Sequence, residues 1–189
     1  MKRLFIAVPI QEQTRNEIVN GIFKDESVRK LPVRWTAYQN LHLTLQFLGD
    51  TEEKRIPEIK RIMDSLPRPA SPVSLSFTTI GAFPNRDSAR IIWLGMKKCD
   101  YLLNSQKKLT ELLDEKGFPV DRKRFKAHLT LGRVRDNAQI TPEAFEHLEQ
   151  LTQSAHISDS PIDKITLYES ILRPGGPIYT AIFEKSLIG

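Results

Sequence analysis

A strand-like pattern that occurs twice constrains this chain more than any other feature of its sequence. Residues 42–45 and residues 128–131 both read His-Leu-Thr-Leu, and each copy lies in a stretch where apolar and polar residues alternate. Alternation with a period of two is typical of a β-strand that has one face in a core and the other face free. The sequence therefore predicts two similar strands, each with a histidine and a threonine on its polar face.

Strict alternation assigns the neighbours of both motifs to faces. In the first copy it places Leu41, Leu43, Leu45 and Phe47 on the apolar face and His42, Thr44 and Gln46 opposite. In the second copy it places Phe125, Ala127, Leu129 and Leu131 on the apolar face and Lys126, His128 and Thr130 opposite. Residues of one face lie about 6.6 Å apart along a strand, so an imidazole and a hydroxyl can flank one phosphate.

The rest of the chain mixes short strands and helices. We expect strands at residues 4–8, 41–48, 73–80, 90–95, 125–134, 164–172 and 178–188. Asp50 with Glu53 resembles a capping box, Thr141-Pro142 is typical of a helix start, and Gly117 is typical of a helix end. This order predicts an α+β fold with antiparallel or mixed sheets.

The composition bounds the class of protein. A length of 189 residues fits one domain or two small fused lobes, and no run approaches the ~20 apolar residues of a membrane helix. The single cysteine, Cys99, cannot form an internal disulfide, so we expect a reducing, cytoplasmic compartment. The opening residues 1–9 are apolar but lead into polar sequence without a cleavage site, and we interpret them as a first strand rather than a targeting segment.

The charge distribution favours an anionic partner. The net charge is +5, and residues 122–135 carry six basic side chains and no acidic one. A basic excess of this kind suits a polyanion such as RNA. On its own it is weak support, because many basic proteins bind no nucleic acid.

Two imidazoles with two hydroxyls match the needs of phosphodiester cleavage by general acid–base catalysis. One imidazole removes a proton from the nucleophile, the other protonates the leaving oxygen, and the hydroxyls donate hydrogen bonds to the phosphate. Neither motif has the acidic or cysteine companions of a zinc or two-metal site, so we expect no metal and no cofactor. We interpret the other histidines, His147 and His156, as exposed and incidental.

These motifs resemble those of the 2H phosphoesterase superfamily, and within it the RNA 2′,3′-cyclic phosphodiesterase family, which is also labelled 2′–5′ RNA ligase. The resemblance spans nearly the whole chain. It is carried by residues 3–7, 40–49, 90–95 and 125–133. One departure is Ala127, where the family commonly has proline before the second histidine. Ala127 is on the expected apolar face, so we expect altered packing there and retained chemistry.

The resemblance implies a single domain over residues 1–189 with two pseudo-symmetric lobes. Each lobe would be an antiparallel sheet with helices on its outer face, and the active-site groove would lie between the sheets. It also implies that His42 is the proton donor and His128 the proton acceptor, with Thr44 and Thr130 holding the phosphate.

Two further residues, Arg133 and Phe47, match positions of the family. Arg133 resembles an arginine near the phosphate, but simple alternation turns it to the wrong face unless Gly132 permits a bulge; otherwise it is a solvated charge. Phe47 matches an aromatic residue that can stack on a base, although its place on the apolar face favours core packing.

The leading hypothesis is thus a metal-independent enzyme that opens RNA 2′,3′-cyclic phosphate ends to 2′-phosphomonoesters, with reversible 2′–5′ ligation, acting as a monomer without a membrane. One alternative is the same chemistry on a small cyclic nucleotide. Another is a non-catalytic module that binds RNA ends. Because the two motifs are nearly symmetric, the residues alone do not assign the acid and base roles. The sequence also leaves open the natural RNA, the importance of ligation and the oligomeric state.

Overall fold

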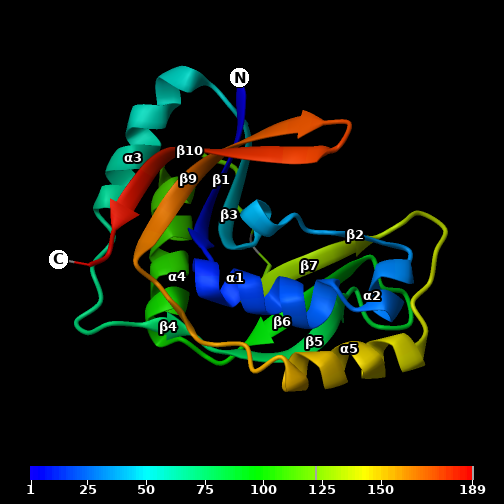
Figure 1. Ribbon diagram of the computed structural model, residues 1–189. Helices are drawn as coiled ribbons and strands as arrows, with labels where there is room; N and C mark the ends of the chain where they lie inside the picture. The colour runs from blue at the N-terminus through cyan, green and yellow to red at the C-terminus, as the bar shows by residue number, and fades with distance from the viewer. Residues whose placement is uncertain (122, 189) are drawn as a thin grey trace.

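The computed structural model describes residues 1–121 and 123–188, so Arg122 of the basic run lies outside the described residues, as does Gly189. The chain forms two four-stranded sheets, a short two-stranded sheet and the helices that pack against them (Figure 1). The pairings between the described strands are antiparallel. The predicted α+β class with antiparallel sheets is therefore confirmed.

The first sheet carries one copy of the motif in its edge strand. The strand order is β10-β9-β1-β3, with β1 (Lys2–Pro9), β3 (His42–Thr51), β9 (Lys164–Arg173) and β10 (Gly176–Ser186). Strand β1 lies between β9 and β3, and its residues 4–8 are all buried. A continuous apolar run is expected for a strand that is covered on both faces.

The second sheet carries the other copy in an interior strand. The order is β2-β7-β6-β5, with β2 (Val33–Trp35), β5 (Phe77–Phe83), β6 (Ile91–Met96) and β7 (His128–Val134). Strands β4 (Ser74–Leu75) and β8 (Ser160–Pro161) form the two-stranded sheet. The strand predicted at residues 125–134 begins only at His128, so Phe125 and Lys126 belong to the segment that leads into β7.

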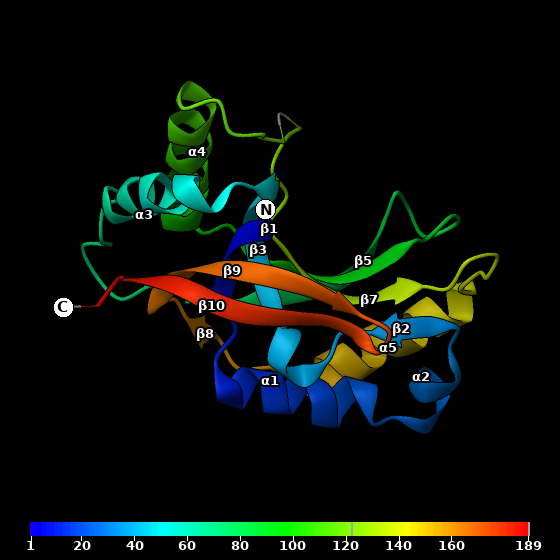
Figure 2. The ribbon, with the colours of Figure 1, turned by 90° about the horizontal axis from the view of Figure 1, so that it is seen from above.

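Helices lie on both sides of the molecule (Figure 2). They are α1 (Glu12–Ile18), η1 (Val19–Phe23), α2 (Glu26–Lys30), η2 (Tyr38–Asn40), η3 (Glu53–Arg55), α3 (Ile56–Asp64), α4 (Asp100–Glu115) and α5 (Pro142–Ser154). Helices α3 and α4 contact each other and reach β10 and β3 of the first sheet, whereas α5 contacts β5 of the second sheet. Among the described residues, no helix is long and apolar enough to span a membrane.

The helix ends predicted at Thr141 and Gly117 are confirmed, and the helix start predicted at Asp50 is wrong. The Thr141 side chain accepts a hydrogen bond from the Ala144 backbone N–H, and Gly117 has a φ of 70° just after α4, as predicted. The capping box predicted at Asp50 is wrong. Strand β3 continues through Asp50 because this residue pairs with Arg3 of β1, and α3 begins only after Arg55.

Both motif strands contain the same irregularity three residues after the histidine. Ala7 pairs with Thr44 and Ile6 with Gln46, which leaves Leu45 as an extra residue in β3. In the same way, the pairing of β6 with β7 leaves Leu131 as an extra residue between Thr130 and Gly132. A β-bulge of this kind shifts the alternation, so the strict alternation predicted beyond Leu45 and Leu131 is wrong.

Candidate active site

His42 is held at the start of β3 by the backbone. Its Nδ1 lies 2.6 Å from the carbonyl oxygen of Asn40. A carbonyl oxygen can only accept, so Nδ1 carries the hydrogen and Nε2 of the neutral ring is the acceptor. That Nε2 lies 3.0 Å from the Thr44 hydroxyl, which donates to it. The motif therefore places a proton-accepting nitrogen and a hydroxyl side by side.

His128 is held in the same way at the start of β7. Its Nδ1 donates to the carbonyl oxygen of Lys126 at 2.7 Å, so Nε2 is again the free nitrogen of the neutral ring. In both copies, the carbonyl that orients the ring belongs to the residue two positions before the histidine. Thr130 follows on the same face, and its backbone carbonyl accepts from the Thr36 hydroxyl at 3.0 Å, which braces β7.

Aromatic rings surround both imidazoles. The His42 ring centroid lies 5.0 Å from that of Phe5 in β1 and 5.3 Å from that of Tyr179 in β10. The His128 ring lies 5.0 Å from Phe83 in β5 and 6.2 Å from Trp93 in β6. Each histidine is therefore lined by aromatic rings from other strands of its own sheet. The sequence pattern gave no signal for these four aromatic residues, because their roles depend on which strands become neighbours.

The strands that begin with the two histidines, β3 and β7, belong to different sheets and contact each other. Burial lowers the pKa of His42 from 6.5 to about 4, and the charge of His128 lowers it further while the Asn40 carbonyl opposes the shift. Burial also lowers the pKa of His128, and the Lys126 ammonium acts in the same direction. Both rings are therefore neutral near pH 7 in the unliganded protein.

The bulges bring Phe47 and Arg133 to the side of the imidazoles. Each lies five residues after its histidine, and in both copies the preceding residue is buried while this one is exposed. Phe47 is 66% exposed, and its ring lies 6.1 Å from Phe5, which also contacts His42. The core packing expected for Phe47 is therefore wrong, because the extra residue at Leu45 turns its side chain out of the core.

Arg133 reaches the other lobe electrostatically. Burial raises the pKa of Tyr179, which contacts His42, and the positive charge of Arg133 opposes that rise. The expectation from simple alternation, that Arg133 faces away, is wrong, since the bulge at Leu131 and Gly132 reverses the face. Gly132 is required there because an added Cβ would overlap a methyl group of Val33 in β2.

The remaining histidines lie apart from this arrangement. His156 is exposed, whereas His147 in α5 is half-buried and bonds to Asp25 at 3.1 Å. His147 is thus not the exposed residue that we expected; it links α5 to the carboxylate that caps α2. In residues 1–121 and 123–188, no group of three histidine, cysteine or acidic side chains is placed to hold a metal ion.

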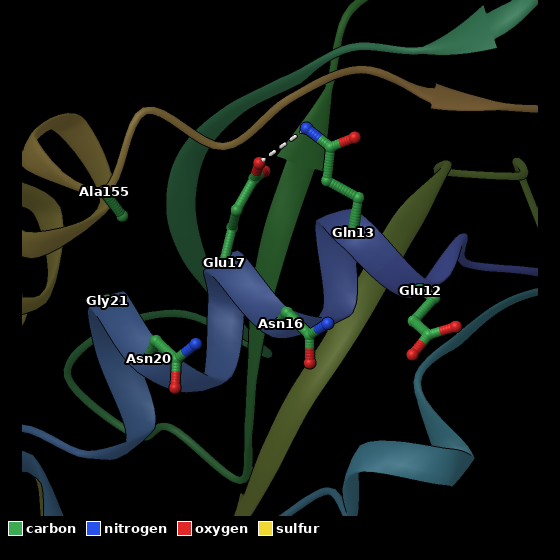
Figure 3. A pocket seen from close by; sticks show the side chains of 7 residues that line it. All are labelled: Glu12, Gln13, Asn16, Glu17, Asn20, Gly21 and Ala155. Atoms are coloured by element: carbon green, nitrogen blue, oxygen red, sulfur yellow. Dashed lines mark hydrogen bonds between the residues drawn. The ribbon is translucent and has the colours of Figure 1, made fainter.

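A polar surface pocket lies along α1 and η1 (Figure 3). Glu12, Gln13, Asn16 and Glu17 line it, and Gln13 donates to Glu17 at 3.1 Å. Neither motif histidine lines this pocket. Its carboxylates repel anions, so it is no candidate for phosphate chemistry.

Comparison with known proteins identifies a family. A family model described as LigT like Phosphoesterase matches the chain twice, over residues 8–93 and 94–179. Each matched half contains one copy of the motif and one of the two bulges. The repeated tetrapeptide is therefore part of a larger internal repeat.

Curated relatives match over nearly the whole chain. The RNA 2′,3′-cyclic phosphodiesterase of Archaeoglobus fulgidus is 36% identical over 177 residues, which cover 94% of this chain and 96% of the relative. The protein of the same name from Thermotoga maritima is 31% identical over 190 residues, which cover 99% of this chain and 96% of the relative.

Solved structures share the fold. A Thermus thermophilus crystal structure superposes with a TM-score of 0.79 at 27% identity, covering 98% of this chain and 97% of that one. E. coli LigT in complex with 3′-AMP superposes with a TM-score of 0.76 at 23% identity, covering 100% of this chain and 99% of that one. The chain therefore shares the fold of E. coli LigT.

Proposed function

Because this chain belongs to the LigT-like phosphoesterase family, we propose that it opens RNA 2′,3′-cyclic phosphate ends to 2′-phosphomonoesters. The single observation that carries the proposal is the pair of imidazoles, each fixed through Nδ1 by a backbone carbonyl at the start of β3 and of β7, two strands that contact each other. The curated relatives in Archaeoglobus and Thermotoga, which are named for this activity, support the choice of substrate.

The proposed reaction is an in-line hydrolysis. Nε2 of His128 takes a proton from water, whose oxygen attacks the phosphorus of the cyclic ester. The bond from phosphorus to the 3′-oxygen breaks, and Nε2 of His42 gives its proton to that leaving oxygen. The new P–O bond is part of a 2′-phosphate, and the two histidines exchange their protons with solvent to complete the cycle.

The neighbouring side chains would stabilise the transition state. The hydroxyls of Thr44 and Thr130 would donate to the non-bridging oxygens, and Arg133 would offset the charge that develops on them. Phe47, exposed beside the site, would stack on the terminal base.

The proton that His42 must donate depends on the substrate. With a pKa of about 4, His42 is neutral near pH 7 when the site is empty. An anionic phosphate between the rings favours the imidazolium and raises its pKa. Substrate binding would thus favour protonation of His42, the general acid, whereas both rings would be neutral in an empty site.

We extend the proposal to the conditions of the reaction. The chain would act as a single bilobal domain and a monomer, in a reducing cytoplasmic compartment and without a metal ion, since the two histidines supply both proton transfers. In ligation, the 5′-hydroxyl of a second strand would attack the cyclic phosphorus in place of water, and the bond to the 3′-oxygen would break. The 3′-oxygen would leave as a hydroxyl, which gives a 2′–5′ linkage.

The test is a product analysis with a short oligonucleotide that ends in a 2′,3′-cyclic phosphate. We expect the wild type to yield the 2′-phosphate, with and without EDTA, and His42→Ala and His128→Ala to lose at least about 10²-fold in rate. The matched control is His156→Asn, since His156 is exposed with a φ of 46°, which asparagine tolerates. Full activity in either motif variant, a 3′-phosphate product or loss of activity with EDTA would contradict the proposal.

A further inference from the structure

A second pocket adjoins the His128 side of the site. It lies between the end of β6, the start of α4 and the segment that leads into β7, and Trp93 and Gly95 of β6 form part of its lining. Gly95 is the direct strand partner of His128, and an added Cβ there would approach the Thr78 hydroxyl to 2.8 Å. The pocket therefore begins at the strand position beside the catalytic imidazole.

The charges around this pocket have one sign. Lys97, Lys98, Arg124 and Lys126 line it, and none of the described lining residues is acidic. Lys98 is neutralised by Asp100 at 2.6 Å, but in the part of the chain that the structure describes, no ion pair engages Lys97, Arg124 or Lys126. Three such cations around one concave surface create a positive potential that attracts anions.

Lys126 connects the pocket to the reaction centre. Its backbone carbonyl orients the His128 ring, and its ammonium lies 4.1 Å from the centroid of the Trp93 ring. The Trp93 ring in turn lies 6.2 Å from the His128 ring. A ligand held at His128 therefore meets these cations as soon as it extends toward α4.

We propose that this pocket binds the phosphodiester backbone of the nucleotides that precede the cyclic end of an RNA, an inference that rests on the proposed function. A strand that ends in a cyclic phosphate can leave the site only in its 5′ direction, and each nucleotide in that direction adds one phosphate. Cations along a concave surface suit the phosphate backbone of a single-stranded nucleic acid. The pocket makes the enzyme prefer oligonucleotides to cyclic mononucleotides.

The test compares two substrates in the full chain: a tetranucleotide with a 2′,3′-cyclic end and a 2′,3′-cyclic mononucleotide. The variant is Lys97→Gln with Arg124→Gln, because both side chains are exposed and line the pocket. Lys126 is left intact because it acts on His128. The matched control removes the same charge elsewhere, through Arg29→Gln with Lys108→Gln on the exposed faces of α2 and α4.

We expect the pocket variant to raise KM for the tetranucleotide about tenfold and to leave kcat/KM for the mononucleotide within about twofold of the wild type. The slope of log kcat/KM against log salt for the tetranucleotide should become shallower by about 1.4, since each lost contact to a single strand contributes about 0.7. The control variant should keep the wild-type slope.

Three outcomes overturn the inference. Equal losses on both substrates would mean that the cations act at the reaction centre. An equal loss in the control would mean that only net charge matters. If an acidic peptide inhibits the tetranucleotide reaction as strongly as an oligonucleotide of the same charge does, the pocket selects charge and not RNA. If the wild type opens neither substrate, the proposed function fails; binding of a 2′-phosphate-ended tetranucleotide, measured by fluorescence anisotropy on the same variants, then tests the pocket separately.

Discussion

Acidification should destabilise this protein through one buried imidazole. The pKa of His42 is about 4 in the folded chain and takes its ordinary value of 6.5 in the unfolded chain. Between these values, the unfolded chain binds a proton that the folded chain excludes, so stability falls as the pH falls. The stabilising contribution is therefore fully present above about pH 6.5 and is lost progressively toward pH 4. At 1.36 kcal/mol per pKa unit, the loss is about 3 kcal/mol.

The variant His42→Asn isolates this effect. Asparagine keeps an N–H donor near the position of Nδ1, so it can still bond to the Asn40 carbonyl, and it does not titrate. Urea unfolding, followed by circular dichroism at pH 7, 6, 5 and 4, gives the free energy of unfolding of both proteins. The carboxylates titrate in both, so the difference between the two curves reports His42.

We expect the wild type to lose about 3 kcal/mol more than His42→Asn between pH 7 and pH 4. Inorganic phosphate, the anion that the site is proposed to hold, should reduce this extra loss because it favours the imidazolium. A difference that does not change with pH, or a wild type that gains stability relative to the variant on acidification, would refute the reasoning.

Three other substitutions probe the surroundings of the site. Phe47→Ala should raise KM for a cyclic-ended oligonucleotide by about tenfold or more, because base stacking is lost. It should leave the urea midpoint unchanged because the ring is exposed, and a large drop in the midpoint would show that Phe47 packs in the core. Arg133→Gln should lower kcat about 10²-fold, as measured in single-turnover kinetics, and unchanged kcat would reduce Arg133 to a solvated charge. Gly81→Ala should cost about 1–3 kcal/mol in urea unfolding, because the new Cβ would overlap the Trp93 ring. Wild-type stability in Gly81→Ala would show that Trp93 moves freely.

The period of the sequence pattern predicted the elements that carry His42 and His128, because a residue near the start of a strand is assigned to a face by its immediate neighbours. The same pattern failed three residues later. A bulge at Leu45 depends on how β1 pairs with β3, and that pairing is set by contacts between distant parts of the chain. Phe47 and Arg133 were therefore assigned to the wrong face by alternation alone, although the family resemblance offered the roles that their exposure now favours.

Local helix signals were reliable where no strand competed with them. Helix α5 begins after Thr141, and Gly117 follows the end of α4, as predicted. Asp50 has a side chain that could cap a helix, but its backbone pairs with Arg3 of β1. The strand pairing along β3 outweighs one capping interaction, which is worth about 1 kcal/mol. Tyr179 lies beside His42, and Trp93 lies beside His128, because of the order of the strands in each sheet. The spacing of residues in the sequence could not predict these contacts.

The extra residue in each motif strand also acts as a stop against sliding. A strand without irregularities can slip along its partner in steps, and one step turns each side chain to the opposite face. Leu45 and Leu131 are unpaired bulge residues, so a change of register would also have to move the bulge along the strand. Deleting either leucine would thus misalign one proton-transfer group with its counterpart while leaving both imidazoles in the chain. The alignment of acid and base is set by two backbone irregularities in which neither histidine takes part.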